Sequence, residues 1–505
     1  MKERRGARWT PDSTNGQVLI LILPFLVTAG TRAVDIASPG SAPGTLSAPA
    51  AMVRTNPELL KTNFSVSIVT NVPVPTKGAT NAPAAKKKSF EWDFSWRGWN
   101  GLQMELSQRT PLSQPLELLS FAGVDSNALP PVQLNEVKLS GTIGGRFVVD
   151  GAGYVTTGNM TGFDDGVELR RALISAQGNC ILVFPVGYLI ELGYIPNSFY
   201  LNQAYLLSPN IDYLGPVQFG VFGPPMGLDL TTSSSDITFM EPAAPLQAIA
   251  PPNEVGIQIG HPVLNQRSTW ALGLFGDQSA SGEYGNASRN YGSAAGRVTW
   301  LAMDQLAPDR PEANRLLHLG LSANFQYSVT SDIQYSSKPE SYIAPIVVDT
   351  GQIAASAASS VADEVAWVNG PFSAQGEFIH SFVQQNTGDL LNFGGFYAYA
   401  SWFLTGESRC YDPSAGAFKR LIPRHNFDFG KDGAWGAFEV ATRISHTDLT
   451  SGDVHGGRMN LLMGQLNWYL QPHVRWMFAA GGGRVTDGPE NGRMFIFQTR
   501  VGVDF

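Results

Sequence analysis

The C-terminal segment of the chain alternates between two sets of side chains, and this period is the strongest constraint on the fold. Counting back from the end, the mainly apolar set is Val503, Val501, Thr499, Phe497 and Phe495. The residues between them are Asp504, Gly502, Arg500, Gln498 and Ile496. A two-residue period is that of a β-strand. A strand with one face for lipid and one for water is the unit of a transmembrane β-barrel. The alternative is a half-buried edge strand of a soluble sandwich.

The composition agrees with a barrel. Charged residues make up only 15% of the chain and aromatic residues 11%, and 54 residues are glycine. Soluble domains carry about a quarter charged residues, whereas alternating strands with aromatic girdles and glycine-bearing turns need fewer. The chain has a net charge of −8 and residues 1–89 carry +7, which leaves −15 on residues 90–505. An acidic body argues against nucleic acid as a partner.

The N-terminal part of the chain has the features of an export signal. Its basic region consists of Lys2, Arg4, Arg5 and Arg8. The apolar run that follows, 18–29, is shorter than the roughly 20 residues that span a membrane. We therefore predict a signal peptide over residues 1–33, with an uncleaved anchor helix as the alternative. A chain exported in this way, with a terminal Phe505 that is typical of an outer-membrane assembly signal, is expected in the outer membrane, in contact with its lipid and its assembly machinery.

Three further regions follow the signal peptide. Residues 34–88 are rich in Ala, Pro, Ser, Thr and Asn and cannot bury a core, so we predict a flexible periplasmic linker. Residues 89–140 form an aromatic-rich segment or hairpin before the barrel. Residues 141–505 repeat a strand and turn pattern and are predicted to form the barrel.

The repeated pattern gives an even number of strands, as a closed single-chain barrel needs. The predicted strands are 141–154, 167–178, 180–192, 203–209, 216–222, 254–261, 269–276, 293–300, 316–327, 361–368, 372–383, 393–404, 435–446, 459–470, 474–480 and 494–505. The fold class is therefore all-β, a 16-stranded antiparallel transmembrane β-barrel.

The connections between these strands differ in length on the two sides, as in outer-membrane barrels. The predicted periplasmic turns are Gly178-Asn179, Asn265-Gln266, Asn369-Gly370 and Gln471-Pro472-His473. The outward loops are mostly longer. The third, 223–253, contains six prolines and is predicted to fold inward and narrow the channel, with an external loop as the alternative. The long connection 405–434, on the periplasmic side, is an exception without a sequence explanation.

No sequence motif indicates catalysis, a metal or a cofactor. Cys180 and Cys410 are predicted to lie far apart and unbonded, and no metal-ligating cluster of cysteine or histidine occurs. Three histidines lie in or near predicted strands, namely His318, His380 and His446. Because no nucleophile signature accompanies them, we expect that the protein is not an enzyme.

Strand parity supplies candidate residues for the channel. Arg500 lies opposite the apolar face of the last strand, and Arg297, Arg443 and Arg475 each alternate with apolar neighbours. Such side chains are predicted to point into the lumen, where guanidinium groups suit oxyanions. The alternative is that each arginine pairs with a lumen carboxylate and has a structural role.

Several segments of the chain resemble one known family. They are Gly98-Trp99-Asn100-Gly101-Leu102, Gly144-Gly145-Arg146-Phe147, Glu168-Leu169-Arg170-Arg171-Ala172, Thr232-Ser233-Ser234, Ile237-Thr238-Phe239-Met240-Glu241, Phe403-Leu404-Thr405-Gly406-Glu407, Gly416-Ala417-Phe418, Leu466-Asn467-Trp468-Tyr469-Leu470 with Pro472, and Val503-Asp504-Phe505. Together they resemble the phosphate-selective porin O and P family in order from about residue 90 to 505. The resemblance implies a 16-stranded homotrimeric outer-membrane channel for passive diffusion of a small solute or inorganic anion.

The resemblance also implies roles for particular residues. Arg146, Arg170 and Arg171 match positions of pore-constriction arginines, and Ser233 and Ser234 match serines whose hydroxyls bind phosphate. Because neighbouring residues of a regular strand face opposite sides, only one of Arg170 and Arg171 can point inward unless one lies at a rim, a bulge or an interface.

The third loop departs from the family pattern. Residues 223–253 contain no Lys or Arg, and the acidic residues in or just after the loop are Asp229, Asp236, Glu241 and Glu254. An acidic constriction favours cations or neutral solutes. The hypotheses are therefore an anion- or phosphate-preferring porin, a general or cation-preferring porin, or a barrel with a role in tethering the cell envelope.

Overall fold

The computed structural model describes residues 64–72, 88–96, 102–108, 138–181, 184–195, 198–276, 291–306, 313–328, 332–430 and 434–505. The predicted signal peptide, 1–33, lies outside these residues. Of the predicted linker, 34–88, the structure describes Lys88 and strand β1 (Phe64–Val72). Strand β1 pairs with β2 (Lys88–Trp96), β2 pairs with β3 (Leu102–Gln108), and β3 pairs with the first residues of β4, all antiparallel.

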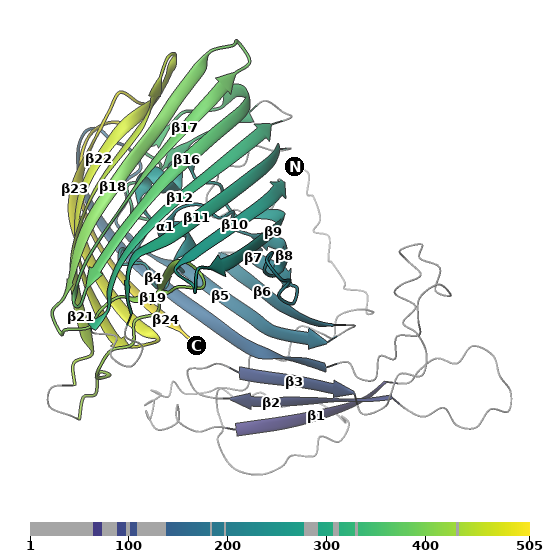
Figure 1. Ribbon diagram of the computed structural model, residues 1–505. Coiled ribbons are helices and arrows are strands. Elements are labelled where there is room, and N and C mark those ends of the chain that lie inside the picture. Colours follow the sequence, from purple (N-terminus) through teal and green to yellow (C-terminus); the bar gives the residue numbers. More distant parts are fainter. Residues whose placement is uncertain are drawn as a thin grey trace, which may run out of the picture. The chain divides into compact units, whose positions relative to one another are not determined.

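Sixteen strands form a closed antiparallel barrel, which confirms the predicted fold class (Figure 1). They are β4 (Lys138–Asn159), β5 (Gly166–Ile181), β6 (Pro185–Ile195), β7 (Ser198–Leu207), β8 (Val217–Phe222), β9 (Glu254–Val263), β10 (Ser268–Gly276), β11 (Tyr291–Gln305), β12 (Arg315–Ser328), β16 (Ile353–Asn369), β17 (Phe372–Gln385), β18 (Leu390–Phe403), β21 (Ala437–Ser451), β22 (Val454–Gln471), β23 (Val474–Thr486) and β24 (Asn491–Asp504). Each pairs with the next, and β24 pairs with β4 to close the sheet.

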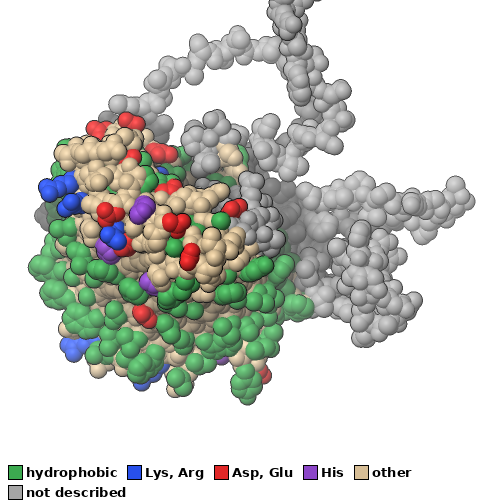
Figure 2. Space-filling view, turned by 90° about the horizontal axis from the view of Figure 1, so that it is seen from above, with side chains coloured by type: hydrophobic (Ala, Val, Ile, Leu, Met, Phe, Trp, Pro, Cys, Tyr) green, Lys and Arg blue, Asp and Glu red, His purple; other side chains and the backbone are tan. Residues whose placement is uncertain are grey.

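The two faces of the barrel wall differ as the sequence period predicts. In β24, Phe497 is 55% exposed on the outer face, whereas Ile496 beside it is fully buried. Along β18, Phe396 and Trp402 are exposed and Tyr397 is buried. Figure 2 shows apolar side chains around the side wall and charged groups on the face turned to the viewer. Apolar groups on the outer face suit contact with lipid.

The turn predicted at Gly178-Asn179 is wrong, because β5 continues through these residues to Ile181. They pair with Gly141 and Ser140 near the start of β4. A Cβ at residue 178 would lie only 2.0 Å from the Ser140 carbonyl oxygen, so glycine here permits close strand approach. The turn at Asn265-Gln266 is correct, and both residues have positive φ.

Residues 223–253, between β8 and β9, form a segment that we call the third loop. It contains α1 (Leu228–Thr231) and α2 (Ala244–Ile249). Apolar residues of the loop, such as Met240 and Leu246, share a core with wall residues that include Ile379 and Met463. These wall residues belong to the buried face of their strands, so the loop packs against the face opposite the exposed apolar one.

A second segment, the 405–436 connection between β18 and β21, also packs against the buried face. It contains a hairpin of β19 (Cys410–Asp412) and β20 (Ala417–Lys419). Tyr411 and Phe418 pack with Leu316 and Val368 of the wall and with Leu228 of the third loop. Three two-residue strands, β13 (Asp332–Ile333), β14 (Ser336–Ser337) and β15 (Val348–Asp349), lie between β12 and β16. Among the described residues, no helix is long and apolar enough to cross a membrane.

Candidate functional site

Arg170 and Arg500 share one carboxylate of the third loop, that of Glu241. Arg170 Nε donates to Glu241 Oε1 at 3.0 Å, and Arg500 Nη2 donates to the same oxygen at 2.5 Å. Arg500 also donates to both carboxylate oxygens of Asp150, at 2.6 Å each, and to the Met240 carbonyl. Burial disfavours the charged form of Glu241, but the two guanidinium groups outweigh it and hold the pKa of Glu241 well below its usual range. The positive charges of Arg170 and Arg500 are therefore balanced by the negative charges of Asp150 and Glu241.

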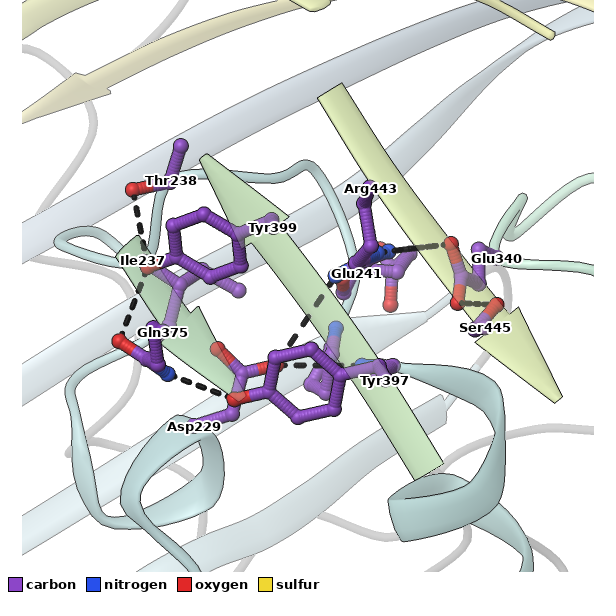
Figure 3. A network of polar contacts seen from close by, with 12 residues as sticks. Asp229, Ile237, Thr238, Glu241, Glu340, Gln375, Tyr397, Tyr399, Arg443 and Ser445 are labelled. Atoms are coloured by element: carbon purple, nitrogen blue, oxygen red, sulfur yellow. Dashed lines mark hydrogen bonds and ion pairs between the residues drawn. The ribbon is translucent and has the colours of Figure 1, made fainter. Parts of the chain in front are cut away.

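Arg443 joins the third loop to the segment between β12 and β16 (Figure 3). Its guanidinium donates to Glu340 Oε2 at 2.9 and 2.5 Å and to the Glu241 carbonyl at 3.1 Å. Glu340 also accepts hydrogen bonds from Ser445 Oγ at 2.7 Å and from the Ala244 backbone amide at 3.1 Å. Arg443 therefore holds two loops in place.

Arg297 has a similar role toward the 405–436 connection. It donates to both oxygens of Glu364, at 2.8 and 2.7 Å, and to the Gly416 carbonyl at 2.9 Å. His318 lies 3.1 Å from Glu364 Oε2 through Nε2 and 2.7 Å from the Tyr411 hydroxyl through Nδ1. This buried cluster fixes the β19–β20 hairpin to the wall.

Arg170 and Arg171 both reach the third loop because the sheet is irregular at this point. The register between β4 and β5 passes from Arg171, opposite Val148, directly to Leu169, opposite Val149. Arg170 is thus the extra residue of a β-bulge, which changes the direction of a side chain. Arg170 binds Glu241, while Arg171 donates a short hydrogen bond to Ser234 Oγ.

Arg146 and Arg475 bind no carboxylate within ion-pair distance among the described residues. Arg146 Nη1 donates to Ser234 Oγ at 2.8 Å, so Ser234 accepts from both Arg146 and Arg171. Arg475 donates to the carbonyls of Ile237 and Thr238 at 2.7 and 2.8 Å. Ser233 is exposed, and its hydroxyl lies 2.9 Å from that of Ser235.

Most carboxylates of the third loop are buried and bind other groups of the protein. Asp229 is buried and accepts from the Ala243 amide at 3.1 Å. Burial raises the pKa of Asp229, and the nearby Arg443 opposes the rise. Glu254, at the end of the loop, is buried and accepts from Ser293 Oγ at 2.9 Å. Asp236 is the loop carboxylate that lines open space.

That open space is a cavity of about 60 Å³ between the third loop, the 405–436 connection and the wall. The third loop contributes Ser234, Ser235, Asp236 and Thr238. The basic side chains that line it are Arg146, Arg409, Lys419, Arg420, Arg475 and Arg500. The acidic ones are Asp236, Glu439 and Asp504. Basic groups therefore outnumber acidic groups two to one around the cavity.

Sequence reasoning missed three of these residues, Arg409, Lys419 and Arg420, all in the 405–436 connection. Arg409 donates to Gln375 Oε1 at 2.9 Å and lies 3.4 Å from the Phe418 ring centre. Arg420 binds both oxygens of Asp504, at 2.5 and 2.7 Å. The unusual length of this connection, which the sequence pattern predicts on the periplasmic side, was the one signal in the sequence that could have pointed to them.

Neither a metal nor a disulfide contributes to the site in the part of the chain that the structure describes. No group of three or more potential metal ligands occurs there, and Cys180 and Cys410 are free.

A closed barrel with an apolar outer face, buried arginines and a basic inner cavity is the architecture of an outer-membrane porin.

Comparison with known proteins identifies the family. A family model described as phosphate-selective porin O and P matches residues 145–501. The chain belongs to the phosphate-selective porin O and P family, and its place is the bacterial outer membrane. The fold and the family are those of a channel.

Two curated relatives and one solved structure show the extent of the similarity. Porin O of Pseudomonas aeruginosa is 25% identical over 383 residues, which cover 68% of this chain and 83% of the relative. An uncharacterized protein of Caulobacter vibrioides is 26% identical over 367 residues, which cover 68% and 69%. An anion-selective porin from Comamonas acidovorans has a TM-score of 0.46 at 11% identity, and the match covers 72% of this chain and 99% of that one.

Proposed function

We propose that this porin lets small hydrophilic anions, with oxyanions such as inorganic phosphate among them, diffuse passively across the outer membrane. The observation that carries the proposal is the excess of basic side chains around the inner cavity. Positive groups in a narrow, low-dielectric opening concentrate anions and exclude cations. Of the acidic residues in or just after the third loop, Glu241 is neutralised by arginines and Asp229 and Glu254 are buried, so that only Asp236 places a negative charge in the cavity lining.

The third loop is proposed to form the constriction. Its contacts with Arg443, Arg475 and Arg500, from three different strands, support this placement. Within the constriction, the Ser234 hydroxyl lies between Arg146 and Arg171. This hydroxyl and the two guanidinium groups would bind a partly dehydrated oxyanion during its passage. The paired arginines, Arg170, Arg297, Arg443 and Arg500, are proposed to hold the loops in place.

The homotrimer that the family resemblance implies is also part of the proposal. An oligomer of this kind should migrate on a semi-native gel as a species that heating converts to monomer. A single monomeric species in mild detergent, by light scattering, would contradict it.

The selectivity is tested by the reversal potential of purified protein in planar bilayers under a salt gradient. We expect anion selectivity, with Arg146→Gln shifting the potential toward the cation side because the substitution removes one unpaired charge from the cavity. Arg458→Gln is the matched control, since Arg458 pairs with Asp448 and Asp487 away from the cavity. Cation selectivity of the unaltered protein would overturn the proposal.

A further inference from the structure

Glu439 of β21 is an enclosed carboxylate in the wall of the inner cavity. Its side chain has no exposed surface, and the residue lines the cavity. Oxygen Oε2 accepts hydrogen bonds from Asn467 Nδ2 at 2.9 Å and from the Tyr469 hydroxyl at 2.8 Å. Oxygen Oε1 has no hydrogen-bond partner among the described residues. One acceptor of this carboxylate is therefore unused.

Most of the buried carboxylates that contact the loops have a cationic partner, whereas Glu377 accepts from the Leu228 and Asp229 amides and from the Tyr397 hydroxyl. Asp150 and Glu241 bind Arg500, Glu340 binds Arg443, and Glu364 binds Arg297. Glu439 has no basic side chain within 4.0 Å among the described residues, and both of its hydrogen-bond donors are neutral. An enclosed carboxylate without a counter-ion is unfavourable, and a cationic group that reaches it removes the penalty.

The basic residues around the cavity do not provide that counter-ion. Arg475 extends its terminal nitrogens to the carbonyls of Ile237 and Thr238, and its Nε has no partner in the described part of the chain. Arg409 donates to Gln375, and Arg420 binds Asp504. Glu439 Oε1 thus has no partner among these basic residues, and Glu439 lines the cavity.

We propose that Glu439 is a binding subsite for the ammonium group of small organic anions that carry a primary amine. The acidic group of such a solute binds Arg146 and Ser234 on another part of the cavity lining, and its ammonium group donates to Glu439 Oε1. This inference rests on the proposed anion channel and narrows its substrate class. It gives a role to an enclosed carboxylate that has no counter-ion among the basic groups of the cavity.

The test compares 2-aminoethylphosphonate with ethylphosphonate, which lacks the amine, as blockers of the chloride current through single channels. We expect 2-aminoethylphosphonate to block at an about tenfold lower concentration, the size expected for one hydrogen bond between charged groups. Glu439→Gln keeps the size of the side chain and an acceptor for Asn467 and Tyr469, so it should make the two blockers equal. Glu490→Gln removes the same charge outside the cavity and should leave the tenfold difference.

The outcomes separate this inference from the function on which it rests. Equal block by the two phosphonates in the unaltered protein, or an unchanged difference in Glu439→Gln, overturns the ammonium subsite even where the reversal potential shows anion selectivity. Cation selectivity of the unaltered protein overturns both. If Glu439→Gln does not give a heat-modifiable barrel, Glu439→Asp replaces it: the shorter carboxylate should weaken the preference for the amine, and full retention counts against the subsite.

Discussion

At the scale of single residues, pairing decides what each lumen arginine does. Arg297, Arg443 and Arg500 all lie on the buried face, as their strand parity indicates. Each nevertheless binds a carboxylate from a distant part of the chain; Arg500 and Asp150 are 350 residues apart. Arg146 and Arg475 have no such partner in the described residues. Which arginines lack a carboxylate partner therefore follows from neighbours in space and not from strand parity.

Loss of Arg500 should strongly destabilise the barrel. Arg500→Gln removes the basic group that binds both oxygens of Asp150 and one of the basic groups that bind Glu241, and breaking a buried ion pair from one side costs about 3–5 kcal/mol. The change is measured as a lower free energy of unfolding in urea, or as a lower temperature of heat modification on gels. Arg458→Gln, at an exposed pair, should give no measurable change. Equal stability of the two variants would show that the buried cluster contributes little.

The anion preference should increase at acidic pH through Asp236. Burial raises the pKa of Asp236, with Arg420 and Arg146 opposing the rise. Asp236 is negative above its pKa, so lowering the pH through that raised value removes one negative charge from the cavity and leaves it more positive. Asp236→Asn should show higher anion selectivity than the unaltered protein at pH 7. Its reversal potential should also change less between pH 7 and 4. An equal pH dependence in both proteins would exclude Asp236 as the group responsible.

At the scale of elements, the alternating pattern located the strands better than their ends. The predicted strand 361–368 is β16 (Ile353–Asn369), because the small residues before Val361 also pair, with β12 and β17. A run of Ala and Ser has little hydrophobic contrast between its faces, so its period is not visible in the sequence. The position of the 405–436 connection was even less visible in the sequence. Its place against the wall depends on partners such as Leu316 and Val368 from other strands.

Removal of the β19–β20 hairpin should widen the channel. Replacing residues 410–419 by a short Gly-Ser linker takes away Tyr411 and Phe418, which pack against the wall, without breaking a pairing between barrel strands. We expect a several-fold higher single-channel conductance and weaker anion selectivity, because Lys419 is also removed. A linker of the same length in place of the hairpin, with Lys419 kept, separates the effect of width from that of charge. Unchanged conductance would mean that the hairpin does not narrow the path.

At the scale of the whole molecule, the last strand closes the barrel. Strand β24 pairs with β4 along its length, and the terminal Phe505 exchanges two backbone hydrogen bonds of 3.0 Å with Gly145. The segment whose alternation identified the strand is therefore also the segment that completes the sheet. Closure leaves no strand edge in the hydrocarbon, as a membrane-spanning sheet requires.

Deletion of Phe505 should reduce assembly more than it reduces the stability of barrels that do form. The residue contributes two backbone hydrogen bonds at the seam, a small part of the contacts between β24 and β4. We expect less heat-modifiable protein in outer-membrane fractions but a nearly unchanged unfolding midpoint for the assembled fraction. Phe505→Tyr, which retains an aromatic end, serves as the control. Normal yield of the deletion variant would argue against a role of Phe505 as an assembly signal.

The sequence by itself determined the barrel, its sixteen strands and the face on which Arg297, Arg443 and Arg500 lie, because a two-residue period is local and requires no knowledge of distant partners. Only the tertiary structure decided how the lumen is filled. The bulge at Arg170, the pairing of Arg500 with Asp150 and Glu241, and the approach of Arg409 and Arg420 to the cavity all depend on contacts between segments far apart in the chain. Net charge along the sequence indicated an acidic constriction. Burial and ion pairing remove most of that charge, and the remaining cavity is basic.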